Sequence, residues 1–135
     1  MDTPSVILSV VIPLLDEAEN LPLLYEQLTK TLQALGQPYE ILFVDDGSRD
    51  ASPLVLEELF RRDRVHVRVL QFRRNFGKTA ALSAGFARAR GQVIITMDAD
   101  LQDDPTEIPA MLAKLNEGYD LVAAWRQRRQ DAWDK

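Results

Sequence analysis

The order of apolar and helical patterns along the 135 residues constrains the fold of this chain most strongly. Strand-like apolar runs alternate four times with segments of helical periodicity, which is typical of a mostly parallel sheet with crossover helices. A chain of this length forms one domain that buries roughly 68–70 % of its unfolded surface. The predicted strands span residues 6–12, 41–44, 65–72 and 93–97, with a short fifth strand at 121–125.

Glycine and short polar residues mark the ends of the predicted helices. Leucines recur at helical spacing over 21–35, and an alanine-rich helix spans 79–90. A glycine after the last turn stops a helix, and an aspartate before the first turn caps it. The expected end residues are Gly36 after the first helix, Asp50 at the N-cap of the second, Gly91 after the third, and Asp104 before the fourth, which spans 108–116.

Composition narrows the class of protein. The chain is 46 % hydrophobic and 27 % charged, as soluble globular proteins are. Its net charge of −5 argues against a nucleic-acid partner. The absence of cysteine excludes disulfides and thiolate metal sites and fits a reducing compartment. The longest apolar run, 6–15, is far shorter than a membrane span. We therefore expect a cytoplasmic domain whose own residues do not cross a membrane.

Polar side chains follow each of the first four predicted strands. In open α/β sheets, ligands bind outside the carboxyl ends of the strands, so these groups are expected to meet at one edge. Four clusters at four strand ends indicate a binding site more strongly than any one of them alone. The clusters are Asp16-Glu17, Asp45-Asp46-Gly47-Ser48, Arg73-Arg74-Asn75 and Asp98-Ala99-Asp100.

The fourth cluster points to a metal ion. Asp98 and Asp100 directly follow the apolar run 93–97, and in an extended backbone side chains two residues apart project to the same side. Two such carboxylates are too repulsive to lie unpaired in a core, but they suit Mg²⁺, which adds water and substrate phosphates to one or two carboxylates. The hypothesis is metal-assisted chemistry on a phosphate ester. The alternative interpretation makes both aspartates solvated loop residues.

Known phosphate and calcium loops do not fit. Phe72 stands where the P-loop that would end in Gly77-Lys78 requires its first glycine. An EF-hand beginning at Asp98 fails because Asp103 and Pro109 occupy its glycine and glutamate positions. The site therefore belongs to another class.

The motifs resemble family 2 glycosyltransferases, specifically the polyprenyl-phosphate branch that includes dolichol-phosphate mannose synthases. They keep their order and spacing over nearly the whole chain. One departure is Leu14-Leu15 before Asp16, where the family often has an aromatic residue or Asn. The matching segments are Val10-Val11-Ile12-Pro13 with Asp16-Glu17 and Asn20-Leu21, Val44-Asp45-Asp46-Gly47-Ser48, Arg74-Asn75-Phe76-Gly77-Lys78 with Ala80-Ala81 and Gly85, and Met97-Asp98-Ala99-Asp100-Leu101-Gln102-Asp103 with Pro105.

The resemblance implies a GT-A fold, a Rossmann-like, mostly parallel sheet in the order 3-2-1-4 with flanking helices. It also implies Mg²⁺ or Mn²⁺ on Asp98, Asp100 and Gln102, held against the diphosphate of a UDP- or GDP-sugar. The substrate-binding residues that it implies are Pro13, Leu14, Glu17, Asp45, Asp46, Lys78, Asp98, Ala99 and Gln102. Asp100 and the phosphate-contacting Arg126 are the implied catalytic residues.

The reaction that the resemblance implies is sugar transfer with inversion onto the phosphate oxygen of a polyprenyl phosphate, as in cell wall biogenesis. Relatives continue past Lys135 with an acceptor-binding segment, a candidate base and membrane-associated helices at the cytoplasmic face. We therefore expect residues 1–135 to be the donor-binding half, truncated on its C-terminal side and inactive in transfer. We also expect a poorly placed segment after Gly118, or self-association through an open sheet edge there.

Two other functions share some of these features. A phospho-acceptor receiver domain also has an aspartate pair and a later aspartate at strand ends, but it needs the pair after strand one and a lysine after strand five. A nucleotidyltransferase shares metal carboxylates and nucleotide binding, but it usually has a glycine-rich loop after strand one, where this chain has Pro13-Leu14-Leu15.

Overall fold

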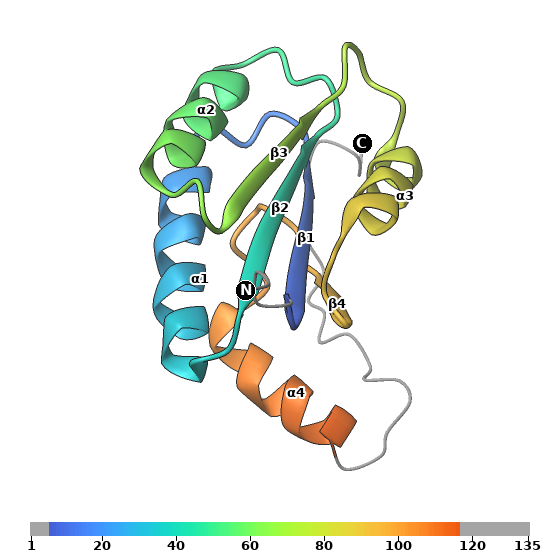
Figure 1. Ribbon diagram of the computed structural model, residues 1–135. Coiled ribbons are helices and arrows are strands. Elements are labelled where there is room, and N and C mark those ends of the chain that lie inside the picture. Colours follow the sequence, from blue (N-terminus) through green and yellow to red (C-terminus); the bar gives the residue numbers. More distant parts are fainter. Residues whose placement is uncertain (1–5, 117–135) are drawn as a thin grey trace, which may run out of the picture.

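The computed structural model describes residues 6–116, which form a four-stranded sheet with helices on both faces (Figure 1). All strands are parallel, and their order is β3-β2-β1-β4, so the expected fold and strand order are confirmed. The predicted strand at 121–125 lies outside the described residues. The elements are β1 Leu8–Leu14, α1 Leu21–Leu35, β2 Tyr39–Asp45, α2 Ser52–Arg62, β3 Val67–Gln71, α3 Lys78–Arg88, β4 Val93–Thr96, the 3₁₀ turn η1 Pro105–Glu107 and α4 Ile108–Asn116.

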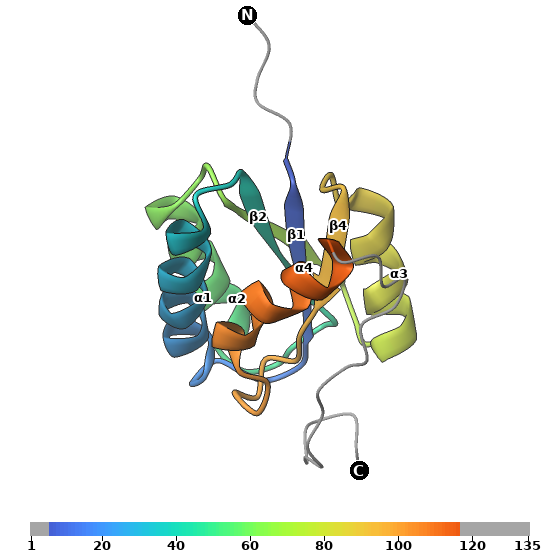
Figure 2. The ribbon, with the colours of Figure 1, turned by 90° about the horizontal axis from the view of Figure 1, so that it is seen from below.

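The two faces of the sheet carry different cores. Views along two directions place α1 and α2 on one face and α3 on the other (Figure 1; Figure 2). Alternate residues of the central strands, such as Val10 and Ile12, pack against the leucines of α1 and α2. Val11 faces the other way, into a smaller cluster with Ala81 of α3. A β-carbon at Gly85 would lie 2.5 Å from the Val11 side chain, so the glycine lets α3 approach the sheet closely.

Helix ends follow the expected chemistry at two positions. Gly36 ends α1 in the left-handed region with φ 71°, which glycine adopts without steric cost. Asp104 lies at the N-cap of η1 and accepts a hydrogen bond from the Thr106 backbone N–H. The hydrogen bonds from Thr106 hold the pKa of Asp104 below its usual value.

Two expected helix ends are corrected by the structure. The N-cap of α2 is Ala51, not Asp50, although an Asp50 oxygen accepts from the Ser52 N–H at 2.8 Å. Helix α3 ends at Arg88, before Gly91. Gly91 is needed for packing instead, because a β-carbon there would lie 2.6 Å from the Ser9 nitrogen of β1.

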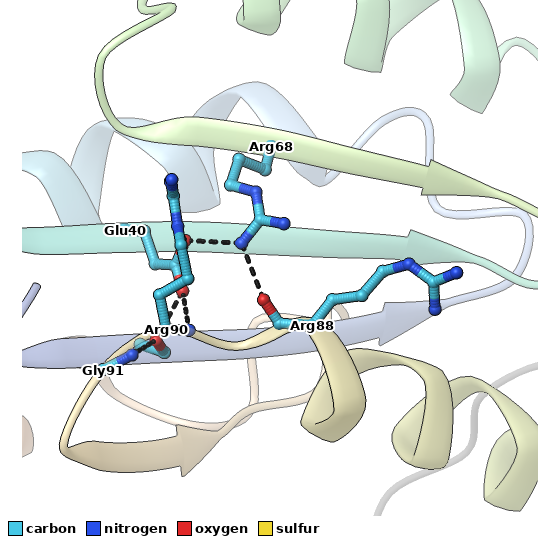
Figure 3. Close-up of polar contacts among 6 residues, drawn as sticks. Glu40, Arg68, Arg88, Arg90 and Gly91 are labelled. Carbon is cyan, nitrogen blue, oxygen red and sulfur yellow. Dashed lines mark hydrogen bonds and ion pairs between the residues drawn. The ribbon is translucent and has the colours of Figure 1, made fainter.

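A buried carboxylate joins the strands at their amino ends. Glu40 of β2 is 1 % exposed, and Arg68 and Arg90 reach it from β3 and from the segment before β4 (Figure 3). It also accepts from the Ser9 hydroxyl at 2.6 Å and from the Arg90 backbone N–H at 2.7 Å. Burial raises the pKa of Glu40, but these hydrogen bonds outweigh it and hold that pKa below its usual value.

Within residues 6–116, no helix is long and apolar enough to cross a membrane.

Candidate functional site

The carboxyl ends of the central strands align at one edge of the sheet. Leu14 of β1 lies opposite Asp45 of β2, which lies opposite Gln71 of β3. The loops that follow these strands therefore begin side by side, as the polar clusters in the sequence predict. Sheet order reverses between β1 and β4, and ligands of open α/β sheets bind in the crevice at such a reversal.

The first two of these loops are tied together by side chains that bond to each other's backbone. Asp16, in the left-handed region with φ 57°, accepts from the backbone N–H of Arg49 at 2.9 Å. In return, Ser48 Oγ accepts from the Asp16 N–H at 2.8 Å, and Asp50 accepts from the Ala18 N–H at 3.1 Å. Burial opposes ionisation of Asp50, but bonds from residues 52 and 18 outweigh it and lower its pKa. Sequence reasoning missed this interlock, because its partners are more than thirty residues apart.

Three predicted substrate-binding residues lie beside this interlock. Pro13 lines a small pocket with residues from β4 and α3, whereas the Leu14 side chain is fully buried in the larger core cluster. Any contact of Leu14 with a ligand would therefore come from its backbone. The Glu17 backbone N–H donates to Ser52 Oγ at 3.0 Å, and its carboxylate accepts from Asn20 Nδ2 at 2.7 Å.

Asp45 holds the turn after β2. It is fully buried, and one oxygen accepts from the Ser48 N–H at 2.8 Å. The other accepts from Gln71 Nε2 at 3.0 Å. Both oxygens thus have partners within the protein, and contact with a ribose or base would require one of these bonds to exchange.

Asp46 fixes the start of α3. Its two oxygens accept from the backbone N–H groups of Phe76 at 2.7 Å and Gly77 at 3.0 Å. Gly47, with φ 78°, passes so close to Arg74 that a β-carbon would lie 2.3 Å from its carbonyl carbon. The predicted third cluster is exposed here, and the Arg74 guanidinium lies 4.9 Å from the centroid of the Phe76 ring. Asp46 therefore connects the end of β2 to the residues directly before α3.

Lys78 and Asp98 meet across the reversal of sheet order. Lys78 is the first residue of α3, and its Nζ lies 2.8 Å from Asp98 Oδ1. The Asp98 side chain is 6 % exposed and the Lys78 side chain 33 %. Asp103, which sequence reasoning did not select, accepts from the Asp98 backbone N–H at 3.0 Å and is itself buried.

Asp100, the second predicted metal carboxylate, lies in a turn and not in an extended strand. β4 ends at Thr96, residues 99–100 form a turn, and Leu101 adopts φ 68°. The extended geometry expected for Asp98 and Asp100 is therefore wrong, because both lie beyond the end of β4 and residues 99–100 themselves form a turn. Asp100 Oδ1 accepts from the backbone N–H of Gln102 at 3.1 Å, and the Gln102 side chain is exposed. The predicted contact Ala99 is buried.

A small cavity of about 50 Å³ lies beside the ion pair. Typical ligand pockets hold about 300–1,000 Å³, so this cavity accommodates a metal and phosphate oxygens sooner than a whole nucleotide. Among residues 6–116, no three His, Cys, Asp or Glu side chains are arranged to hold a metal. Two carboxylates still fit Mg²⁺ or Mn²⁺, because substrate phosphates complete such sites. The residues that line the cavity are Pro13, Lys78, Leu82, Thr96, Met97, Asp98 and Asp103.

Fold and site together define a doubly wound α/β protein with an acidic crevice where sheet order reverses. Residues 9–135 match glycosyl transferase family 2, and the chain belongs to that family. The strand order also differs from the 2-1-3-4-5 order of receiver domains, which removes that alternative. The predicted phosphate contact Arg126 lies outside the described residues.

Solved structures with the same fold include a mannosyltransferase, a glucosyl-3-phosphoglycerate synthase and a part of TarS. The chain spans about a third of the length of each, so the likeness concerns one part of those proteins. A mannosyltransferase from Pyrobaculum calidifontis, PcManGT, in complex with GDP-Man and Mn²⁺, is 21 % identical at a TM-score of 0.62, over 84 % of this chain and 35 % of that one. Glucosyl-3-phosphoglycerate synthase from Mycobacterium tuberculosis, in complex with Mn²⁺, UDP and phosphoglyceric acid, is 21 % identical at 0.65, over 82 % and 39 %. Residues 1–349 of S. aureus TarS, in complex with UDP-GlcNAc, are 22 % identical at 0.58, over 83 % of this chain and 32 % of that one.

Proposed function

We propose that residues 1–135 form the nucleotide-sugar-binding part of a metal-dependent glycosyltransferase. The observation that carries this proposal is the buried Asp98 at the carboxyl end of β4, beside the reversal of sheet order in a family 2 chain. Support comes from solved structures of the same fold that hold Mn²⁺ together with UDP or GDP-Man.

Asp98 and Asp100 would hold Mg²⁺ or Mn²⁺, with Gln102 as a further oxygen ligand. When bound, the metal would act as a Lewis acid on the departing nucleoside diphosphate. The chain's own residues would bind and orient the donor around it. Pro13 and Glu17 would shape the nucleobase pocket at the end of β1, where the interlock of Asp16 with the next loop keeps the backbone in place.

The remaining residues predicted to bind the nucleotide sugar differ in how directly they could contact it. Lys78 and the backbone of Ala99 and Leu14 would contact the nucleotide sugar. Asp45 would reach a ribose or base only after exchanging a bond to Ser48 or Gln71. Asp46 would act indirectly, because it holds the two residues directly before α3.

The acceptor that the motifs favour is a polyprenyl phosphate. Its phosphate oxygen would attack the anomeric carbon with inversion while the bond to the nucleoside diphosphate breaks. That oxygen is already anionic at neutral pH, so it needs orientation more than deprotonation, and Arg126 would contact the phosphate. The acceptor segment and any membrane association at the cytoplasmic face would lie outside these residues. Self-association would involve the edge of the described sheet at β4.

Nucleotide-dependent thermal stabilisation tests the proposal. UDP, GDP, CDP and TDP are added with and without Mn²⁺, and ligand at 100 times its Kd should add roughly 2.7 kcal/mol of apparent stability. Asp98→Ala and Asp100→Ala should abolish the metal-dependent part. Glu26→Ala on the exposed face of α1 is the matched control. An unchanged melting shift in both aspartate variants would remove the metal role.

A further inference from the structure

The ion pair between Lys78 and Asp98 joins two anchored backbones through one long side chain. The Asp98 N–H is held by the buried Asp103, and the residues before Lys78 are held by Asp46. The lysine ammonium bridges the remaining distance, with Nζ 2.8 Å from Asp98 Oδ1. Its side chain is one-third exposed, so the four-carbon stem can change rotamer while both backbones stay in place.

A metal ion on Asp98 and the ammonium of Lys78 cannot share this position. Mg²⁺ lies about 2.0–2.1 Å from a carboxylate ligand, and the ammonium already contacts Oδ1 at 2.8 Å. The two cations would be a few ångströms apart at a carboxylate that is only 6 % exposed, where Coulomb repulsion is much stronger than in water. The lysine must therefore leave Asp98 before a metal binds there.

The position of Lys78 gives the displaced ammonium a second anionic partner. It is the first residue of an eleven-residue helix, and the positive end of a helix dipole favours anions. Lysine binds phosphate as a point charge on a rotatable stem. A diphosphate brought to Asp98 by a metal would lie within the reach of this side chain.

We propose that Lys78 is the built-in counter-ion of the metal site: it neutralises Asp98 when no metal is bound and moves to the diphosphate when metal and nucleotide enter. The inference rests on the proposed function. Metal alone has to displace the lysine without offering it a new partner, whereas nucleotide supplies one. Mn²⁺ and nucleoside diphosphate therefore bind with positive coupling, and Lys78 carries much of that coupling.

Mn²⁺ titrations of the 135-residue chain test this role. Binding is followed by electron paramagnetic resonance with and without UDP or GDP, for the unsubstituted chain and for four variants. These are Lys78→Gln, Lys78→Arg, Lys30→Gln and Asp98→Asn. Lys30 is exposed on α1, on the opposite face of the sheet from α3, so it controls for net charge. Circular dichroism melts check the fold of each variant. Lys78→Met keeps the aliphatic stem and replaces the Gln variant if that one unfolds.

The counter-ion role predicts opposite changes in the two titrations. Lys78→Gln should bind Mn²⁺ alone about tenfold more tightly and should lower the coupling to nucleotide by a similar factor. Lys78→Arg and Lys30→Gln should match the unsubstituted chain. Unchanged or weaker Mn²⁺ binding by Lys78→Gln, with binding abolished in Asp98→Asn, would overturn the inference and leave the proposed function standing. Unchanged Mn²⁺ binding by Asp98→Asn would overturn both.

Discussion

Two buried carboxylates at opposite ends of the same sheet are held in different ways. Glu40, at the amino ends of the strands, accepts from the Ser9 hydroxyl, a backbone N–H and two arginines. Asp98, at the carboxyl ends, is paired with the ammonium of Lys78 on a flexible stem. Glu40 joins β1, β2, β3 and the segment before β4, so its donors belong to the scaffold itself.

The difference separates a stabilising carboxylate from one suited to a ligand. The Ser9 hydroxyl on β1 and the Arg90 backbone N–H cannot leave Glu40 without disturbing the fold. Removing a partner from a buried ion pair is also costly. A lysine at a helix start can leave Asp98 by changing rotamer. Substitutions at the amino ends of the strands should therefore change the free energy of unfolding. Substitutions at the carboxyl ends of the strands should change the binding of metal and nucleotide.

The largest effect is expected from Glu40→Ala. It leaves Arg68, Arg90 and the Ser9 hydroxyl without their shared acceptor and should lower the free energy of unfolding by about 3 kcal/mol. Urea denaturation measures this loss, with Glu26→Ala as a control close to zero. The chain that remains folded should still respond to Mn²⁺ and nucleotide. A loss below that of an ordinary surface substitution would contradict the scaffold role.

The next largest effect is expected from Gly47→Ala, which should lower the free energy of unfolding by about 2 kcal/mol. The added β-carbon would meet the Arg74 backbone at 2.3 Å, in a residue with φ 78°. Gly36→Ala is the matched comparison, because its φ of 71° carries the same backbone strain with nothing within 4 Å. A larger urea-measured loss at Gly47 than at Gly36 would show that the carboxyl-end loops are closely packed, and equal losses would argue against it.

Acid should weaken the contacts that Glu40 makes at the amino ends of the strands. Its pKa is lower in the folded chain than in the unfolded one, so its stabilisation is fully present above about pH 4.3 and is lost as pH falls through the folded pKa. Stability of the unsubstituted chain relative to Glu40→Gln should therefore shrink between pH 6 and pH 3, by at most about 1.4 kcal/mol per pH unit. Parallel curves from urea melts across that range would contradict this assignment.

Asp46→Asn should lower the free energy of unfolding by about 1 kcal/mol. The amide oxygen can still accept from Phe76 or Gly77, but the second acceptor is lost. Since Asp46 holds the start of α3, the variant should also weaken nucleoside diphosphate binding in the presence of Mn²⁺. Calorimetric titration measures this second effect. Asp50→Asn, at the interlock, is the comparison that leaves α3 untouched, and equal effects on binding would remove the link to Lys78.

The smallest change in stability is expected from Asp98→Asn, less than about 1 kcal/mol, because the partly exposed Lys78 can be hydrated when its partner loses charge. Its response to Mn²⁺ and nucleotide should nevertheless disappear. Thermal melts with and without ligand give both quantities. A stability loss as large as that of Glu40→Ala would break the contrast between the two carboxylates.

Sequence patterns alone predicted the alternation of strands and helices, the Gly36 and Asp104 helix ends, and the gathering of polar residues at one edge. Those features depend on residues close together in the chain, where hydrophobic period and capping chemistry act directly. Strand order and GT-A fold were reached through the family motifs, not through periodicity.

Tertiary packing, in contrast, sets which carboxylates stabilise the fold and which face a ligand site. The bonds of Glu40 to Arg68 and Arg90 join residues 28 and 50 positions apart, and the contact of Gly91 with β1 spans 82. No local pattern shows that Asp45 and Asp46 accept from backbone N–H groups of the loops, whereas Asp98 pairs with Lys78. Each partner is set by strand register and helix placement, and these depend on the packing of the whole sheet.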